Sequence, residues 1–126
     1  MIIGIGTDIV RVARLEAGLA RFGRRYAERI LDAVEEDEFD ASARQAHFLA
    51  KRFAAKEAAA KALGTGFRGV FGLRDIRVAH DALGCPRLLL HGGARIRADQ
   101  LGAKTVHLTL SDEADYAVAF VILEGA

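Results

Sequence analysis

The chain has 126 residues, 52% of them hydrophobic and 28% charged, which is typical of one folded globular domain spanning residues 1–126. Its formal net charge of +1 argues against a nucleic-acid-binding protein, because contacts to phosphate backbones need an excess of positive charge. The single Cys85 excludes an internal disulfide, and no apolar run reaches the roughly 20 residues of a membrane span. Gly4 and Asp8 interrupt the apolar start of the chain, which is unlike a signal peptide. We therefore expect a cytoplasmic protein.

Residues 2–10 alternate in the manner of a β-strand. One face of this strand would carry Ile3, Ile5, Thr7 and Ile9. The other face would carry Gly4, Gly6, Asp8 and Val10. Because glycine has no side chain, the second face leaves room for a ligand or for another backbone to come close, with a carboxylate at its end.

Three helical segments are predicted next. Residues from about 12 to 31 read as one or two helices, with Gly18 and Gly23 as weak points. The acidic residues 32–40 predict a short helix with a solvated face. A long helix is then expected from about residue 43 to residue 63, ending at Gly64, since glycine is favoured just after a helix.

The second half of the chain mixes strands with helices. We expect, in order, a glycine-containing loop at 67–72, strands at 75–79 and 87–91 joined by a hairpin-like turn at 81–86, a short helix at 94–101, and strands at 105–111 and 116–123 joined by a polar turn at 112–115. The last strand is apolar on both faces, which suits a central strand or one covered by a neighbouring subunit. This order predicts an α+β domain.

Asp8 and Glu57 form the first candidate site. Glu57 lies one helical turn beyond Phe53, on a stripe expected to pack inward, and Lys61 lies one turn further on. Two acids from distant parts of the chain are suited to a hard divalent cation such as magnesium, which takes a few carboxylate oxygens and completes its shell with water and phosphates. Alternatively, Asp8 caps the strand end and Glu57 pairs with Lys61 or Lys56.

The long helix also carries a candidate phosphate site. Its members are Lys51, Arg52, Lys56 and Lys61 with the turn Gly64, Thr65 and Gly66. Lysines bind phosphate oxygens as point charges, and a glycine-rich turn exposes backbone N–H groups. The helix dipole itself repels anions at a C-terminus, so the turn would have to use its own N–H groups. The alternative is a solvated basic face with a glycine cap.

Two further groups have both a functional and a structural interpretation. His107 lies on the polar face of its predicted strand, where it can act as a base or contact a ligand, or be a structural histidine. The N-terminal helices interleave basic and aromatic side chains, namely Arg14, Arg21, Phe22, Arg25 and Tyr26. Such a surface can dock an acidic helix, because the charges steer and the apolar residues anchor. It can also be the solvated face of an amphipathic helix.

With these residues assembled, the chain resembles the holo-acyl-carrier-protein synthases, the small bacterial type of 4′-phosphopantetheinyl transferase. Three blocks carry the resemblance: residues 4–10, residues 48–66, and residues 107–113 followed by 116–119. Between them, Gly84-Cys85-Pro86 resembles the Gly-Lys-Pro turn of the family. The order and spacing of the blocks match along nearly the whole chain. The resemblance implies the fold of this family, a small α+β domain with an antiparallel sheet packed on one long and several short helices.

The resemblance also implies a reaction. Asp8 and Glu57 would hold magnesium against the diphosphate of coenzyme A, and the serine hydroxyl of an apo acyl carrier protein would attack the β-phosphate, leaving 3′,5′-ADP. Lys61 would stabilise charge on the transferring phosphate. Glu57, a metal-bound water and His107 all remain candidates for the base that takes the serine proton. The activity would support fatty acid biosynthesis.

The remaining site residues follow from the same resemblance. Coenzyme A would be held by Lys51, Arg52, Lys56, Gly64, Thr65, Gly66, Pro86 and His107. The acidic recognition helix of the carrier protein would meet Arg14, Arg21, Phe22, Arg25 and Tyr26. Family members of this size are typically homotrimers with active sites between subunits. Neither nucleic acid nor a membrane is expected as a partner.

Two positions depart from the family pattern. Asp112 stands where many relatives carry a histidine, which argues against a mechanism that needs that histidine. Cys85 replaces the usual lysine beside Pro86 and removes one cation that would meet a phosphate of coenzyme A. The rival function is a non-catalytic module that docks an acidic protein through its N-terminal arginine face.

Overall fold

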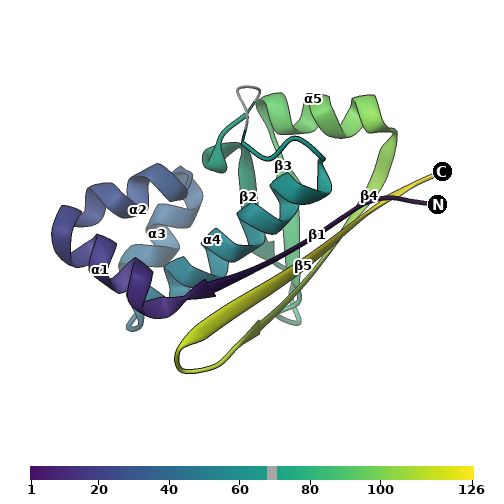
Figure 1. Cartoon of the computed structure of the whole chain (residues 1–126). Coiled ribbons are helices and arrows are strands. Elements are labelled where there is room, and N and C mark those ends of the chain that lie inside the picture. The colour runs from purple at the N-terminus through teal and green to yellow at the C-terminus, as the bar shows by residue number, and fades with distance from the viewer. Residues whose placement is uncertain (68–70) are drawn as a thin grey trace.

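The computed structural model describes residues 1–67 and 71–126 (Figure 1). In these two ranges the elements are β1 (Ile2–Arg11), α1 (Val12–Phe22), α2 (Arg24–Ile30), α3 (Ala33–Ala41), α4 (Gln45–Ala62), the short 3-10 helix η1 (Leu73–Asp75), β2 (Ile76–His80), β3 (Pro86–Leu90), α5 (Gly92–Leu101), β4 (Ala103–Asp112) and β5 (Tyr116–Gly125). Every predicted strand and helix is present, with ends that differ by at most two residues. The predicted loop at 67–72 lies partly outside the described residues.

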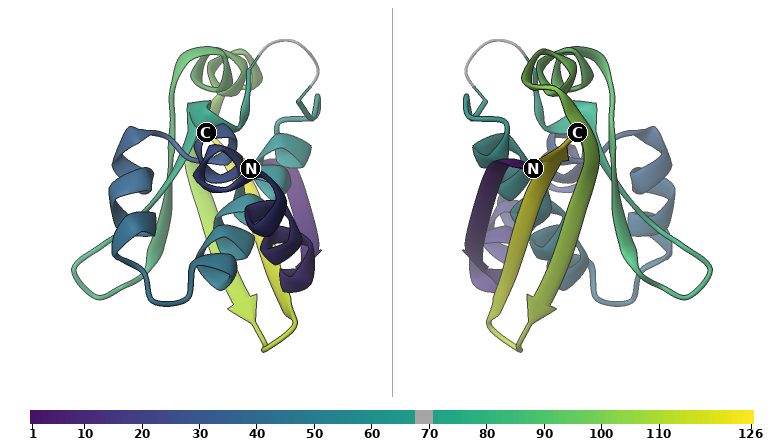
Figure 2. Two further views of the ribbon diagram at one scale, coloured as in Figure 1. Left: turned by 90° about the vertical axis from the view of Figure 1, so that its left-hand side faces the viewer. Right: turned by 90° about the vertical axis from the view of Figure 1, so that its right-hand side faces the viewer.

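An antiparallel three-stranded sheet in the order β1-β5-β4 forms one side of the molecule, and β2 and β3 form a separate hairpin. The central place of β5 confirms what its apolar character on both faces predicted. Helix α4 packs on β1 and β5, and Figure 2 (right) shows the three strands in front with the helices behind them. The sheet therefore has one face covered by α4 and one face that no described element of the chain covers.

The glycines of β1 bring the backbone of α4 against the sheet. A Cβ atom on Gly4 would lie 2.2 Å from the carbonyl oxygen of Ala62, and one on Gly6 would lie 2.0 Å from that of Ala58. Both distances are far below van der Waals contact, so only glycine permits this approach. Of the two predicted uses of the glycine face, the approach of another backbone is therefore the one observed.

The uncovered face of the sheet is apolar. Ile5 and Ile9 are 60% and 63% exposed on it, and β5 adds half-buried Phe120 and Ile122. The antiparallel register places Ile5 beside Ile122 and Thr7 beside Phe120. This patch is called the outer sheet face below. An apolar surface of this kind commonly marks a contact with another protein.

The helical segments follow the predicted breaks. Gly23 separates α1 from α2 with a positive φ of 67°, and Gly64, with a φ of 84°, follows the end of α4. Helix α3 begins with a capping box between Asp32 and Glu35. The prediction for α3 was wrong in one respect, because Glu35 is completely buried although it stands in an acidic stretch that looked solvated.

Candidate active site

Asp8 of β1 and Lys61 of α4 are in contact. The Lys61 ammonium donates to the Asp8 carboxylate over 3.1 Å and to the carbonyl oxygen of Thr7 over 2.9 Å. Lys56, by contrast, pairs with Glu35. The alternative in which Glu57 pairs with Lys61 or Lys56 is therefore wrong, and within residues 1–67 and 71–126 the Glu57 carboxylate has no ion pair.

The electrostatic surroundings of Glu57 differ from those of a paired acid. Partial burial is the largest cause that raises the pKa of Glu57, and the nearby negative charge of Asp8 raises this pKa further. The positive charges of Lys61 and Arg14 lower the pKa by less. Two neighbouring carboxylates with incomplete neutralisation are suited to a hard divalent cation. In the described part of the chain no cluster of three metal-binding side chains occurs, so such a cation would need oxygens from water or a ligand as well.

An open pocket of about 580 Å³ lies next to Lys61 and is lined by the turn Gly64, Thr65 and Gly66. The sequence predicted this grouping of a lysine with a glycine-rich turn, and the structure brings the four residues together. Gly64 and Gly66 both have positive φ angles, 84° and 58°, which a residue with a side chain rarely adopts. The N–H groups of Gly64 and Gly66 donate to the carbonyl oxygens of Lys61 and Ala60, so within the described residues the Thr65 N–H is the one left for an anion in the pocket.

Arg97 is a neighbour of this turn that sequence analysis missed. Its Nε atom donates to the carbonyl oxygen of Leu63 over 2.9 Å, and its guanidinium lies beside Gly64. The contact bridges α5 and the end of α4, which are 34 positions apart in sequence. No local pattern links the two segments, so only the fold reveals Arg97.

Arg52 and Lys56 do not face the pocket, which corrects their prediction as phosphate ligands. Arg52 is 4% exposed and Lys56 is fully buried. Both are bound to Glu35 by hydrogen bonds inside the protein, so neither cation is accessible to a phosphate in this structure. The basic residues of α4 therefore do not form one face, because Arg52 and Lys56 point into the protein whereas Lys61 is exposed.

Lys51 lies at the other end of α4 from the pocket beside Lys61. It lines a smaller cavity of about 260 Å³ together with Arg44, His47 and Asp112. The Arg44 guanidinium is 3.0 Å from His47 Nε2, and that nitrogen is 2.8 Å from the carbonyl oxygen of Ala114. Asp112, the position that departs from the family pattern, therefore lies among cations.

His107 and Pro86 are not near the Lys61 pocket within one chain. His107 is on the outer sheet face, where its Nε2 atom lies 3.0 Å from the Glu124 carboxylate. Asp8 pairs in register with Ala119, whose side chain is buried under α4, so Asp8 and His107 point to opposite sides of the sheet. Pro86 begins β3, next to the exposed Cys85 of the hairpin turn.

Of the five N-terminal residues predicted to dock a partner, together called the arginine surface below, printed contacts connect Arg21, Phe22 and Tyr26. Arg21 lies over the ring of Phe22 at 5.0 Å, and that ring stacks on Tyr26 at 6.2 Å. Arg14 lies over the ring of Phe53 at 5.1 Å and is close enough to Glu57 to affect its pKa. Arg25 is exposed on α2. The arginine surface therefore borders the acidic site.

The comparisons with known proteins agree on one family. The family model described as the 4′-phosphopantetheinyl transferase superfamily matches residues 4–121. A holo-[acyl-carrier-protein] synthase from Halorhodospira halophila is 58% identical over 123 residues, which cover 98% of this chain and 98% of that protein.

Solved structures extend the likeness to the fold. The holo-[acyl-carrier-protein] synthase from Neisseria meningitidis has a TM-score of 0.92 at 45% identity, covering 98% of this chain and 99% of that one. The synthase from Bacillus anthracis, in complex with CoA (3′,5′-ADP), has a TM-score of 0.82 at 38% identity, covering 100% and 99%. The α+β fold expected from the sequence, an antiparallel sheet packed on one long and several short helices, is confirmed.

Proposed function

The chain belongs to the 4′-phosphopantetheinyl transferase superfamily, and we propose from this premise that it transfers 4′-phosphopantetheine from coenzyme A to a serine of apo acyl carrier protein. The products are holo acyl carrier protein and 3′,5′-ADP, and the role is in fatty acid biosynthesis. The observation that carries the proposal is the placement of Asp8, Glu57 and Lys61 at the edge of a pocket with a glycine-rich turn. Phosphoryl transfer requires mainly positioning and charge neutralisation, which these groups supply.

Asp8 and Glu57 are proposed to hold Mg²⁺. Their fit to this ion comes from the structure, because the two oxygen ligands repel each other and Glu57 has no ion pair in the described residues. When bound, Mg²⁺ would neutralise charge on the diphosphate of coenzyme A. Lys61, whose side chain is 53% exposed, can turn its ammonium from Asp8 toward a phosphate oxygen in the adjoining pocket.

Glu57 is proposed to take the proton of the attacking serine, directly or through a water. A carboxylate can act as a general base when it lies within hydrogen-bond reach of the proton it accepts, directly or through one water. The turn of Gly64, Thr65 and Gly66 would bind phosphate through the Thr65 N–H, because the N–H groups of the two glycines donate to carbonyl oxygens of α4. Arg97 would hold the turn in place. Arg52 and Lys56 take no direct part.

A homotrimer with active sites between subunits is the proposed assembly. Support comes from the outer sheet face, where Ile5 and Ile9 are each about 60% exposed in the single chain. His107 lies on that same face, on the side of the sheet away from Asp8. In an assembly that covers the outer sheet face, His107 of one subunit can approach the coenzyme A of a neighbouring subunit, whereas within one chain it does not reach the Lys61 pocket.

The acidic partner is proposed to bind on the arginine surface. Arg14 joins this surface to Glu57, so a helix docked there would bring its serine to the acidic site. None of the described helices is long and apolar enough to cross a membrane. We propose a cytoplasmic location because coenzyme A and carrier proteins are found there in bacteria.

Intact mass spectrometry of apo acyl carrier protein tests the function. The carrier protein is incubated with this protein, coenzyme A and Mg²⁺, and a parallel sample contains a chelator. We expect a mass gain of one phosphopantetheine that is lost with the chelator, with Asp8→Ala and with Glu57→Gln. Asp37→Asn, a change of an exposed acid on α3, is the control and should retain full activity. No gain with several carrier proteins from folded protein would favour the docking module instead.

A further inference from the structure

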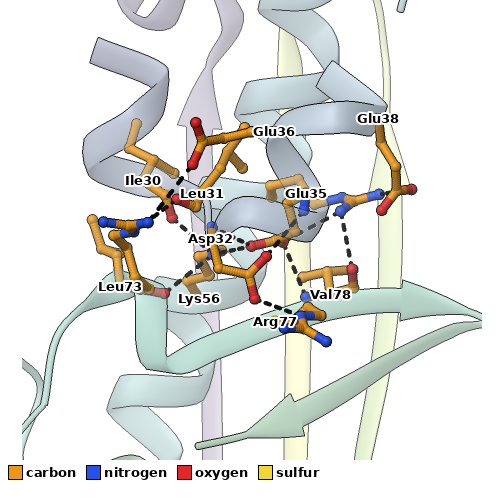
Figure 3. Close-up of polar contacts among 12 residues, drawn as sticks. Ile30, Leu31, Asp32, Glu35, Glu36, Glu38, Lys56, Leu73, Arg77 and Val78 are labelled. Carbon is orange, nitrogen blue, oxygen red and sulfur yellow. Dashed lines mark hydrogen bonds and ion pairs between the residues drawn. The ribbon is translucent and has the colours of Figure 1, made fainter. Parts of the chain in front are cut away.

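Glu35 lies at the centre of a buried polar network on the side of α4 away from β1 (Figure 3). One carboxylate oxygen accepts from Lys56 Nζ over 2.6 Å and from the backbone N–H of Asp32 over 3.1 Å. The other accepts from Arg52 Nη1 over 3.3 Å and from the backbone N–H of Val78 over 3.0 Å. Four donors, from the N-cap of α3, from α4 and from β2, thus meet on one side chain.

Lys56 is held as completely as Glu35. Besides its bond to Glu35, its ammonium donates to the carbonyl oxygens of Ile30 over 2.7 Å and Leu73 over 3.1 Å. An ammonium has three protons, and all three are used. Burial lowers the pKa of Lys56, while the charge of Glu35 opposes that shift.

Arg52 extends the network to β2 and to the surface. Its guanidinium donates to the carbonyl oxygen of Val78 over 2.9 Å and to the Glu38 carboxylate over 3.1 Å. At the other end, Arg77 pairs with Asp32. Three acids therefore face three cations, and in the described part of the chain no buried side-chain nitrogen or oxygen lacks a hydrogen-bond partner.

The network adds a constraint on the rotation of α4 that its face toward the sheet supplies only weakly. The face of α4 against the sheet is made of small residues, among them Ala54, Ala55, Ala58 and Ala62. Small side chains let the helix approach closely, but they interlock weakly and resist rotation about the helix axis less than large ones. The directional hydrogen bonds of Arg52 and Lys56 supply that resistance.

The candidate active site lies next to these anchors on the same helix. Glu57 follows Lys56 directly, and Lys61 lies one turn beyond Glu57. A rotation of α4 about its axis would therefore move both side chains relative to Asp8, which belongs to β1. A misplacement of about 1 Å at a reacting group can reduce a rate by roughly 100-fold.

We propose that Glu35 is a positioning residue for the transfer reaction. By binding Lys56 and Arg52 it sets the rotation of α4, and thereby the places of Glu57 and Lys61 relative to Asp8. The inference rests on the proposed function for its kinetic part. It also makes a prediction about metal binding that needs no turnover.

Glu35→Gln is the variant that tests this role. Since all four partners of Glu35 are donors, the NH₂ group of a glutamine must face two of them, whichever way the amide is turned. We expect kcat for phosphopantetheine transfer to fall by about tenfold or more while KM for coenzyme A changes less than about twofold. Binding of Mn²⁺, followed by electron paramagnetic resonance, should weaken by about tenfold.

Leu88→Ala is the matched control. Leu88 is a buried residue of β3 that forms none of the hydrogen bonds of the network, and its truncation lowers stability by leaving a cavity. Both variants are assayed well below their melting temperatures. Leu88→Ala should retain the kcat and the Mn²⁺ affinity of the wild type, and equal values for the two variants would overturn the positioning role.

A milder variant covers the case in which Glu35→Gln does not fold. Arg52→Lys keeps the charge but loses the guanidinium fork that joins Glu35, Glu38 and Val78. It should lower both kcat and the affinity for Mn²⁺, as Glu35→Gln does. Wild-type values in Arg52→Lys, or failure of both variants to fold, would show that the network is purely structural. If the wild type itself transfers nothing, the proposed function fails, while the Mn²⁺ measurement still decides on the positioning of Asp8 and Glu57.

Discussion

Two groups of acids and cations lie on different sides of α4 and differ in how completely they are paired. On one side Glu35, Lys56 and Arg52 are buried, and in the described residues no buried side-chain nitrogen or oxygen lacks a hydrogen-bond partner. On the other side Lys61 is half-exposed on Asp8, and Glu57 has no ion pair within the described residues. The same residue types thus hold the fold together where they are saturated and remain free to bind ligands where they are not.

The comparison is tested most strongly by removing one lysine from each side. Lys56→Met leaves Glu35 without its closest cation and two carbonyl oxygens without a donor. Breaking a buried pair in this way costs about 3–5 kcal/mol, so the variant should unfold at much lower urea concentration. Lys61→Met should unfold like the wild type, because an exposed ion pair contributes little.

Activity tests the role of Lys61 in the transfer reaction. Lys61→Met should lose about 100-fold in kcat/KM for transfer, since it removes a cation at the transferring phosphate. Lys104→Met, on exposed Lys104 of β4, is the control and should have no effect on either property. A Lys61→Met protein that is fully active, or one as unstable as Lys56→Met, would contradict the division between the two sides.

The difference between the two sides also explains what could be predicted from the sequence. Alternation and glycine positions sufficed for β1, for the break at Gly23 and for the end of α4, because these signals are local. The grouping of Lys61 with the glycine-rich turn was predictable because the turn follows Lys61 closely along the chain and both suit phosphate binding.

Burial of charged residues was not predictable from such signals. Lys56 and Lys61 look alike along α4, and only the packing of α3 and β2 shows that Lys56 is interior. Glu35 was hidden in an acidic stretch for the same reason. Arg97 depends on a contact between α5 and the end of α4, which no spacing rule contains.

A substitution on the arginine surface tests binding of the carrier protein without changing Asp8, Glu57 or Lys61. Arg21→Glu reverses one charge beside Phe22, away from Glu57 and Lys61. We expect KM for apo acyl carrier protein to rise by about tenfold, with KM for coenzyme A unchanged, and the effect should shrink at high salt. Steady-state kinetics at two ionic strengths measure this. Arg95→Glu, on the exposed face of α5, is the control, and an equal effect there would make the charge change non-specific.

Half-buried Arg97 is expected to support coenzyme A binding by holding the glycine-rich turn, without touching the reacting groups. Arg97→Ala removes the hydrogen bond to the Leu63 carbonyl oxygen and loosens the turn at Gly64. KM for coenzyme A should rise by about fivefold, as expected for one charge-assisted hydrogen bond, with kcat nearly unchanged. Arg95→Ala on the same helix should leave both constants as they are. A fall in kcat alone would show that Arg97 acts on the reacting groups instead.

The smallest effect expected is a pH dependence of stability that originates at Glu57. Burial and Asp8 raise its pKa in the folded protein above the ordinary value of 4.5, so the folded state binds this proton more tightly than the unfolded state. Glu57 therefore favours folding less as the pH rises from about 4.5 through the raised pKa. Glu57→Gln has no such proton, and the melting temperature of the variant minus that of the wild type should increase over this range and then stay constant. A constant difference across the range would mean that Glu57 is as well neutralised as the buried Glu35, and the contrast between the two sides of α4 would then not hold.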